Sequence, residues 1–244
     1  MNQNDNLKSE LFGAWSGVLF AVVYVILMAV VARMLPPPSP IFTPEQLAAY
    51  WAERPGITFG ASAVAFFSFL LITWSAGLTI MLARIEGNAP FWTIVQAMGG
   101  ALTGWVFIST PVRLVLAGFR GIDDPVALQS VVDSAWLDLT MTYVVTSVQY
   151  WAIGIVGLMD KRENPLFPQW LCYLTILSGA VWMTYSGIPW NRTGPLAWDG
   201  LVGLYVAFTA FLGTMVVLSI YMIKDVRKRM RNAEFSTVNL AHSA

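Results

Sequence analysis

Three charged residues lie where the sequence is otherwise apolar, and their types could support chemistry inside a membrane. Arg113 falls within a long apolar stretch, near its predicted outer end, and Asp138 and Asp199 lie at a similar depth in two later stretches. A charge inside a bilayer costs a few kcal/mol or more unless it has a partner or a wet cavity. We therefore expect Arg113 to pair with Asp138, with Asp199 or with both, beside a hydrated recess. The alternatives are an ion pair that only ties helices together and an arginine that reaches out to the head groups.

Polar residues near these charges follow two helical stripes. At 100° per residue, Asp138, Thr142, Thr146 and Gln149 fall within about 80° of one another. A comparable stripe runs through Gln96, Thr103, Thr110 and Arg113. Consecutive helices joined by a short link usually pack together, so the two stripes can face each other across a polar seam or pocket. The alternative is that the hydroxyls and amides simply hold the helices together.

Aromatic residues are frequent at the predicted outer face, where they form an interfacial belt or the mouth of such a pocket. The candidate ligand-binding residues are therefore Arg113, Asp138, Asp199, Thr142, Thr146, Gln149, Gln96, Trp136 and Trp198. No catalytic residue is assigned.

Pro111 interrupts the stretch that carries Arg113 and frees a backbone carbonyl near position 107, which favours a kink. The sequence predicts no clear break halfway along any of the helices.

Several chemistries lack the residues they need. The chain has one histidine, His242, and one cysteine, Cys172. Histidine clusters for di-iron sites, axial ligands for haem, Cys or His sets for zinc, and Ser-His or Cys-His dyads are therefore missing from the sequence. No glycine-rich phosphate loop precedes a helix of a soluble domain. The sequence thus predicts no metal and no cofactor, and any catalysis would depend on Asp, Glu, Tyr and Arg.

The elements that must position these residues are membrane-spanning helices. The sequence is 57% hydrophobic and only 11% charged. About 20 apolar residues cross a bilayer, and within lipid such segments must be helices. Six stretches qualify: Leu11–Met34, Ile57–Ala83, Phe91–Ala117, Ala135–Met159, Gln169–Ile188 and Ala197–Ile223. We predict an all-α bundle of six transmembrane helices, with a short N-terminal segment (1–10), the membrane domain (11–223) and a basic, disordered tail (224–244).

Two short helices are predicted on the outer face of the membrane. Thr43-Pro44-Glu45-Gln46 has the pattern of a capping box with proline at the first helical position. Leu47, Tyr50 and Trp51 then share one face, which favours a helix lying on the membrane interface. Asp124-Pro125 is a second cap with proline, and it leads into the fourth transmembrane helix.

Lys and Arg set the predicted orientation. With the N-terminus inside, the cytoplasmic segments carry nine of these residues and the opposite segments carry four. Both termini are therefore expected in the cytoplasm. The basic tail is interpreted as a topology anchor, with recognition of anionic lipids as the alternative. A formal net charge of zero indicates no nucleic-acid partner.

Four segments carry a resemblance to known proteins: Pro36-Pro37-Pro38-Ser39-Pro40, Asp133-Ser134-Ala135-Trp136, Phe167-Pro168-Gln169-Trp170 and Gly194-Pro195-Leu196-Ala197-Trp198-Asp199-Gly200. With these segments the chain resembles an uncharacterised family of bacterial multi-pass integral membrane proteins. The resemblance implies a location in the bacterial inner membrane and transfers no site residue.

Three functions remain open at this stage. The first is a protein that binds or passes a lipophilic or amphipathic small molecule in a polar pocket between the third, fourth and sixth helices, near the outer face. The second is a cofactor-free isomerase, cyclase or hydratase with Asp138 or Asp199 as general acid, which needs a buried carboxyl group that Arg113 does not neutralise. The third is an accessory subunit of a membrane complex. The lipid bilayer is the expected partner, and the sequence leaves oligomerisation open.

Overall fold

The chain folds as a bundle of helices. The computed structural model describes residues 3–120 and 123–242, with side chains for 5–119 and 123–234, and these residues form helices and loops without a β strand. Within the described ranges, six helical segments are long and apolar enough to cross a membrane: Asp5–Val31, Gly56–Glu86, Phe91–Phe119, Pro125–Met159, Gln169–Trp190 and Leu201–Glu234. The predicted all-α polytopic fold is therefore confirmed. We call these segments the first to sixth spans.

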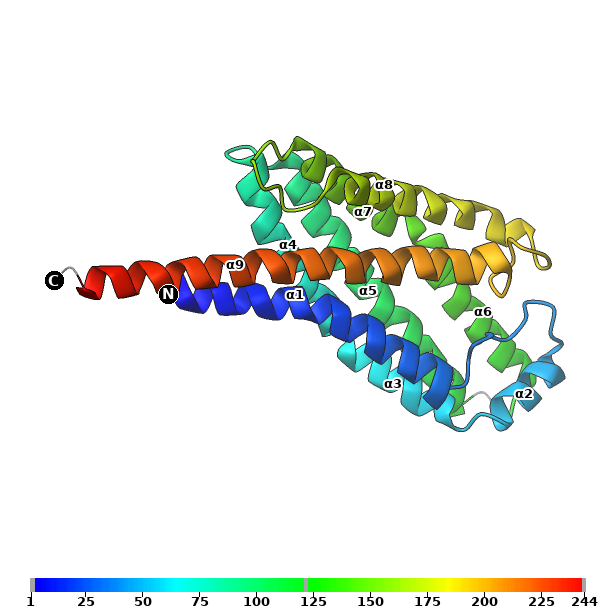
Figure 1. Ribbon diagram of the computed structural model, residues 1–244. Coiled ribbons are helices and arrows are strands. Elements are labelled where there is room, and N and C mark those ends of the chain that lie inside the picture. The colour runs from blue at the N-terminus through cyan, green and yellow to red at the C-terminus, as the bar shows by residue number, and fades with distance from the viewer. Residues whose placement is uncertain (1–2, 121–122, 243–244) are drawn as a thin grey trace.

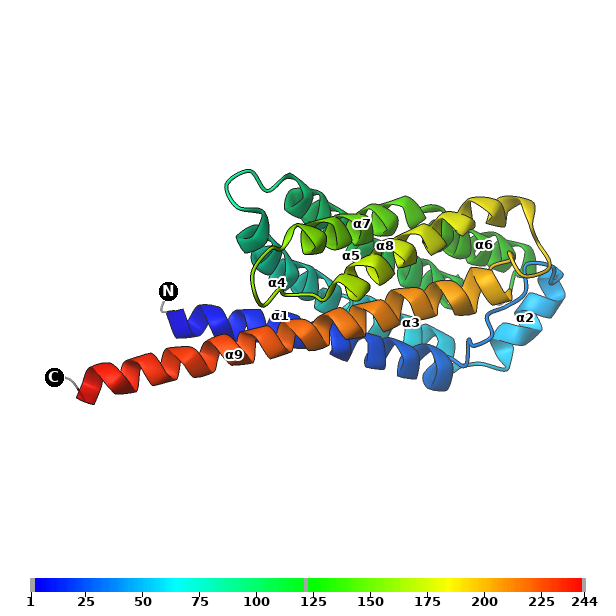
Figure 2. The same ribbon diagram turned by 45° about the horizontal axis from the view of Figure 1, so that its top comes forward.

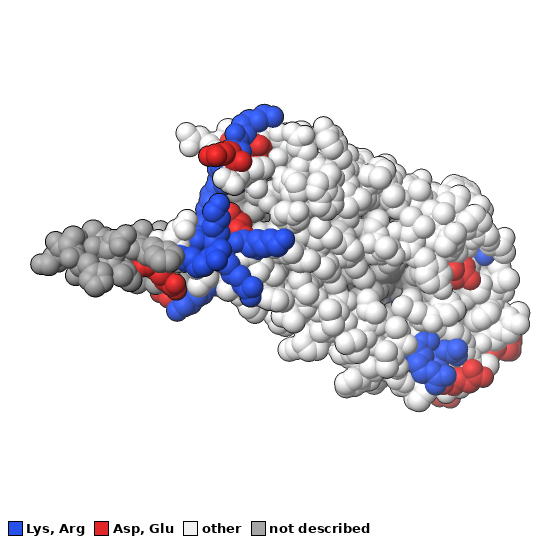
Figure 3. Space-filling view, in the orientation of Figure 1, with Lys and Arg blue, Asp and Glu red and all other residues white. Residues whose placement is uncertain are grey.

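The two ends of the chain lie at the same end of the bundle, which we call the termini end (Figure 1). The opposite, far end carries α2 (Pro44–Ala52) and the loop between the fifth and sixth spans. Lys and Arg surround α9 (Thr214–His242) where it leaves the bundle at the termini end, and a smaller group of charges marks the far end (Figure 3). The surface between these two groups is largely uncharged in this view, as a lipid-facing belt requires.

The capped helix α2 begins where the sequence predicts. The Thr43 hydroxyl accepts a hydrogen bond from the Gln46 amide at 3.3 Å, and the Gln46 side chain accepts one from the Thr43 amide at 2.9 Å. Leu47, Tyr50 and Trp51 do share a face, but this face is buried, and α2 packs against α6 (Pro125–Met141). Its apolar stripe is thus covered by protein.

The second predicted cap is the start of the fourth span itself. The Asp124 carboxylate accepts hydrogen bonds from the Val126 and Ala127 amides, both at 3.1 Å, and α6 follows. The span is interrupted at Thr142 and continues as α7 (Tyr143–Met159). The second span is likewise divided at Ser68 into α3 (Gly56–Phe67) and α4 (Phe69–Glu86). The expectation of helices without a break along their length is therefore wrong for these two spans.

The third span, α5 (Phe91–Arg120), is the central helix. It packs against α3, α4, α6 and α7, and α8 (Gln169–Trp182) covers α7 on the outside (Figures 1 and 2). The fifth span ends in a 3₁₀ helix, η2 (Met183–Trp190). The bundle therefore places Arg113 and the polar stripe of α5 against α6, which carries Asp138, and α7, which carries Thr146 and Gln149.

The first and sixth spans contain π-helical turns. The first span runs from α1 (Gln3–Val25) into η1 (Ile26–Val31), and the sixth begins with η3 (Leu201–Val206) and η4 (Thr209–Gly213) before α9. The two spans lie side by side at the termini end and separate toward the far end (Figure 1). At Gly17 they approach so closely that a β-carbon would collide with the Ser219 hydroxyl.

α9 continues as a helix through the segment 224–242, for which the sequence predicted disorder. No proline or glycine interrupts this segment, and an ion pair of Asp225 with Arg229 spans one helical turn. Both features favour continuation of the helix.

Candidate functional site

Arg113 is paired with one of its two predicted partners. Its guanidinium forms an ion pair with Asp138 across the interface of α5 and α6. Asp138 also accepts hydrogen bonds from Ser109 at 2.6 Å and Thr110 at 3.2 Å. Asp199 is half-buried, and no side chain of the described residues forms an ion pair with it.

Irregular backbone surrounds this ion pair. Pro111 frees the carbonyl of Phe107, as the sequence predicts, and the Ser68 hydroxyl donates to that carbonyl at 2.7 Å from the interruption between α3 and α4. The Thr142 hydroxyl donates to the Asp138 carbonyl at 2.7 Å from the interruption between α6 and α7. Hydroxyl groups thus satisfy the backbone where helical hydrogen bonds are lost.

The two polar stripes meet, but at fewer positions than the helical projection indicates. Thr103 of α5 and Thr146 of α7 share a hydrogen bond of 3.1 Å. Gln96 turns toward α4, where it donates to Ser75 at 3.0 Å and accepts from Thr79 at 2.8 Å. Gln149 is buried against Gly99 and Gly100, and its side-chain oxygen has no partner. This seam is closely packed, and its hydroxyls and amides mainly join the helices.

Open space lies elsewhere in the bundle. A cavity of about 340 Å³ lies between the first and sixth spans, in the half of the bundle toward the far end. We call it the α1–η4 cavity. It is lined by Tyr24, Val25, Met28, Met34, Leu35, Trp136, Leu204, Tyr205, Phe208, Thr209, Leu212 and Gly213. Of the nine sequence-predicted ligand-binding residues, only Trp136 belongs to this lining. The site is thus displaced from the interface of the third, fourth and sixth helices on which the sequence analysis concentrated.

The α1–η4 cavity opens on the side of the bundle. Val25, Leu35 and Tyr205, which line it, are 45%, 44% and 47% exposed, so they form its rim. Val25 and Tyr205 belong to the first and sixth spans, and Leu35 lies in the loop that follows the first span. The cavity is therefore open between the apolar surfaces of these two spans.

π-Helical turns contribute residues to both walls of this cavity. Met28 comes from η1, Leu204 and Tyr205 from η3, and Thr209 and Gly213 from η4. π-Helical turns are rare, and they occur frequently at functional sites, because each widens the helix and redirects side chains at some cost in stability. Their coincidence with both walls favours a role for the cavity beyond a packing defect.

The lining residue Trp136 is stacked on a second tryptophan that lies outside the cavity. Trp136 and Trp198, both predicted from the sequence, stack with ring centroids 6.3 Å apart and an interplanar angle of 17°. The Trp198 indole donates to the Pro38 carbonyl at 2.9 Å, which ties the stack to the proline-rich loop after the first span. The Trp136 indole nitrogen is buried and has no hydrogen-bond partner.

A smaller cavity lies on the inner side of Trp136. Its volume is about 20 Å³, which is enough for one water molecule. It shares Tyr24, Met28 and Trp136 with the α1–η4 cavity and reaches Thr110. Since Thr110 donates to Asp138, the Arg113–Asp138 pair lies behind this smaller cavity and outside the lining of both.

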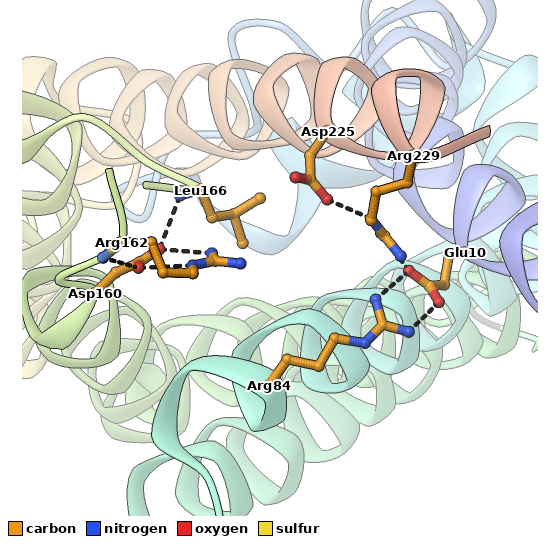
Figure 4. Close-up of polar contacts among 7 residues, drawn as sticks. All are labelled: Glu10, Arg84, Asp160, Arg162, Leu166, Asp225 and Arg229. Carbon is orange, nitrogen blue, oxygen red and sulfur yellow. Dashed lines mark hydrogen bonds and ion pairs between the residues drawn. The ribbon is translucent and has the colours of Figure 1, made fainter. Parts of the chain in front are cut away.

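An ion cluster at the termini end was missed by the sequence analysis (Figure 4). Glu10, whose side chain is 2% exposed, forms ion pairs with Arg84 of α4 and Arg229 of α9, and Arg229 also pairs with Asp225 at 2.8 Å. Arg227 of α9 lies 5.8 Å above the Trp15 ring of α1. These contacts hold the first and sixth spans together at the end opposite to the α1–η4 cavity. The sequence did contain a signal for this cluster. Glu10 precedes the first apolar stretch, whereas Arg84 and Arg229 follow the second and the sixth, so all three lie on the same side of the predicted bundle.

Beside this cluster, Asp160 organises the loop between the fourth and fifth spans (Figure 4). It pairs with Arg162 at 2.6 Å and accepts from the Leu166 amide at 2.8 Å. Burial alone raises the pKa of Asp160, but hydrogen bonds from Arg162 and from the Leu166 and Arg162 amides outweigh it and hold the pKa below its ordinary value. The group is therefore a fixed anion, which suits an anchor and does not suit a general acid.

Acid catalysis needs a buried carboxyl group without a cation beside it. Within the described part of the chain, the side chains of Glu10 and Asp160 are almost fully buried and both are paired with arginine. Asp138 is paired with Arg113, while Asp133 and Asp199 are only half-buried. No group of three or more His, Cys, Asp and Glu residues that could hold a metal ion occurs among the described residues.

Comparisons with family models, with curated proteins and with solved structures gave no match for this chain.

Proposed function

We propose that this protein binds a lipophilic small molecule in the α1–η4 cavity and takes it up from the surrounding bilayer. The observation that carries the proposal is an apolar cavity of about 340 Å³ with its rim on the lipid-facing side of the bundle. Specific ligand cavities have volumes of about 300–1,000 Å³, mostly apolar walls and a few placed polar groups. The hydroxyls of Tyr24 and Thr209 are such groups here.

The location of the ligand follows from the proposed orientation. We place the protein in the inner membrane of a bacterium with both termini in the cytoplasm, on the basis of the Lys and Arg distribution and of the family resemblance. In that orientation the cavity opens toward the outer leaflet. A reporter fused to the C-terminus that is active only in the cytoplasm tests this orientation.

Gly213 offers a way to fill the cavity without disturbing the fold. It lines the cavity, and a β-carbon built there meets no atom within 4 Å. Gly213→Trp therefore places an indole in open space. Ile220→Trp is the matched control, because Ile220 lies on the same span, is 41% exposed and does not line the cavity.

The experiment is mass spectrometry of small molecules that co-purify with the protein in a mild detergent or in native lipid discs. We expect the wild type and Ile220→Trp to retain one lipophilic species far above its abundance in the membrane, and Gly213→Trp to lose it. The proposal is refuted if the wild type carries only bulk lipid, or if Gly213→Trp retains the species at the wild-type level.

A further inference from the structure

The basic residues of α9 lie mainly on one face of the helix where it leaves the bundle. Four of them are exposed and are spaced by three or four positions or fewer: Lys224, Arg227, Lys228 and Arg231. At 100° per residue they fall within about 100° of one another. Met222 and Val226 occupy the opposite face and are fully buried, so the four cations point away from the bundle. We call these four residues the basic stripe.

The basic stripe carries charge that the protein does not neutralise. Asp225 of the same helix and Glu10 of α1 are engaged by Arg229 and Arg84, which lie outside the stripe. Among the residues whose side chains the structure describes, none forms an ion pair with a member of the basic stripe. The stripe therefore presents four positive charges to its surroundings.

The basic stripe begins where the hydrocarbon of a bilayer ends. From Leu201 to Ile223 the sixth span has no charged residue, and this segment is roughly 34 Å long at about 1.5 Å per residue. The hydrocarbon core is about 30 Å thick, and each head-group layer adds about 5–8 Å. Lys224 therefore lies at the border of the hydrocarbon, and Arg231, about 10 Å further along the helix, lies at the outer edge of the head groups. Lys and Arg accordingly gather between the uncharged surface and the projecting part of α9 (Figure 3).

Aromatic rings position two of the four cations at this depth. The Arg227 guanidinium lies 5.8 Å from the centre of the Trp15 ring of α1. The Lys224 ammonium lies 5.1 Å from the centre of the Tyr221 ring, which makes a T-shaped contact with Trp170 of α8 at 6.4 Å. Tryptophan and tyrosine are enriched where hydrocarbon meets head groups, and their faces attract cations. Contacts with α1 and α8 thus hold part of the stripe in place before a lipid binds.

We propose that the basic stripe binds the head groups of anionic phospholipids in the leaflet at the termini end. Lys and Arg donate charge-assisted hydrogen bonds to phosphate oxygens, and a head group with a net negative charge is attracted more strongly than a zwitterionic one, which carries its own ammonium. A topology anchor needs only a sufficient number of cations. A lipid site also needs them on one outward face at head-group depth, and the basic stripe has this arrangement. The site is separate from the α1–η4 cavity and does not depend on the proposed function.

The experiment is native mass spectrometry of the full-length protein with phosphatidylglycerol and phosphatidylcholine of identical acyl chains. The ratio of the two binding constants measures the preference for an anionic head group. Lys224→Gln/Lys228→Gln removes two charges from the stripe, and Lys224→Arg/Lys228→Arg keeps them. The matched control is Lys8→Gln/Lys161→Gln, because both lysines are exposed at the same end but lie outside α9. Size-exclusion profiles confirm that the variants fold.

We expect the wild type to prefer phosphatidylglycerol and Lys224→Gln/Lys228→Gln to lose at least tenfold of that preference, because each cation at an anionic surface contributes about fivefold. Lys224→Arg/Lys228→Arg, the matched control and Gly213→Trp should all stay within about twofold of the wild type. High salt should lower the preference of the wild type toward that of the stripe variant, since exposed charges are screened.

Four results would overturn the proposal. The first is a wild type that does not prefer phosphatidylglycerol. The second is an equal loss in the stripe variant and in Lys8→Gln/Lys161→Gln, which would show that the charge of the whole end attracts the lipid. The third is displacement of the lipid by an equal concentration of glycerol 3-phosphate, which would show a site for a soluble phosphate. The fourth is a loss of the preference in Gly213→Trp, which would place the lipid in the α1–η4 cavity.

Discussion

Glu10→Gln tests whether the ion cluster at the termini end joins the first and sixth spans. Glu10 accepts three hydrogen bonds from guanidinium groups, two from Arg84 and one from Arg229. Charge-assisted bonds of this kind contribute about 1.5–3 kcal/mol each, so three bonds at the middle of this range give about 7 kcal/mol, which we take as the upper value. Glutamine has the same shape but only one acceptor oxygen and no charge.

Two features of the cluster reduce that upper value. The Arg84 and Arg229 side chains are 44% and 29% exposed, so water can solvate them once the carboxylate is lost. Arg229 also keeps its ion pair with Asp225. About half of the upper value then remains, and we expect Glu10→Gln to lower the free energy of unfolding by about 3 kcal/mol.

The assay is equilibrium unfolding in detergent micelles followed by tryptophan fluorescence, with Glu163→Gln as control, because Glu163 is exposed in a loop at the same end. Spin labels on α1 and α9 near the termini should report a longer and broader distance distribution in Glu10→Gln alone. A loss of stability within about 0.5 kcal/mol of the control, the usual range for surface substitutions, would refute the assignment of the cluster as a clamp.

Three further predictions use the same unfolding assay. Because the pKa of Asp160 is lowered in the folded state, its contribution to stability is present above the unfolded-state pKa of about 4 and is lost as the pH falls through the folded-state pKa. Asp160→Asn should therefore flatten the dependence of the unfolding free energy on pH between these two pKa values. A pH profile identical to that of the wild type would contradict this. Gly17→Leu should destabilise by about 1–3 kcal/mol or more, because its side chain collides with Ser219, and an unaffected protein would show that the two spans do not pack there. Arg113→Met should cost about 2–4 kcal/mol by leaving Asp138 unpaired within the membrane, and the double variant with Asp138→Asn should recover most of that loss, whereas additive losses would contradict the pairing.

The fold could be predicted because membrane insertion leaves few choices. Length and apolarity define the six spans, and the capping signals at Thr43 and Asp124 locate two helix starts to the residue. The interruptions at Ser68 and Thr142 could not be predicted, because hydroxyls in α-helices usually bond the preceding turn without breaking it. At Ser68 the hydroxyl contacts the Val64 carbonyl of the preceding turn and also the Phe107 carbonyl, which is far away in the sequence.

The candidate site was only partly predictable, and for different physical reasons. The cost of a lone charge in lipid required a partner for Arg113, but the choice of Asp138 over Asp199 depends on how the spans pack, which no local pattern records. A cavity depends on volume left unfilled between side chains from distant segments, such as Met28 and Gly213. Trp136 was named as a candidate for its position among the aromatic residues of the predicted outer face, and in the structure it lines the α1–η4 cavity.

The contrast between Arg113 and the α1–η4 cavity suggests where ligand sites occur in such bundles. A protein must fold before it meets its ligand, and a guanidinium left unpaired in lipid would oppose folding by several kcal/mol, so its charge is neutralised internally, here by Asp138. An intramembrane charge that is paired inside the protein is therefore a poor marker of a ligand site. In this chain the open volume beside the irregular helices η3 and η4 is the better marker.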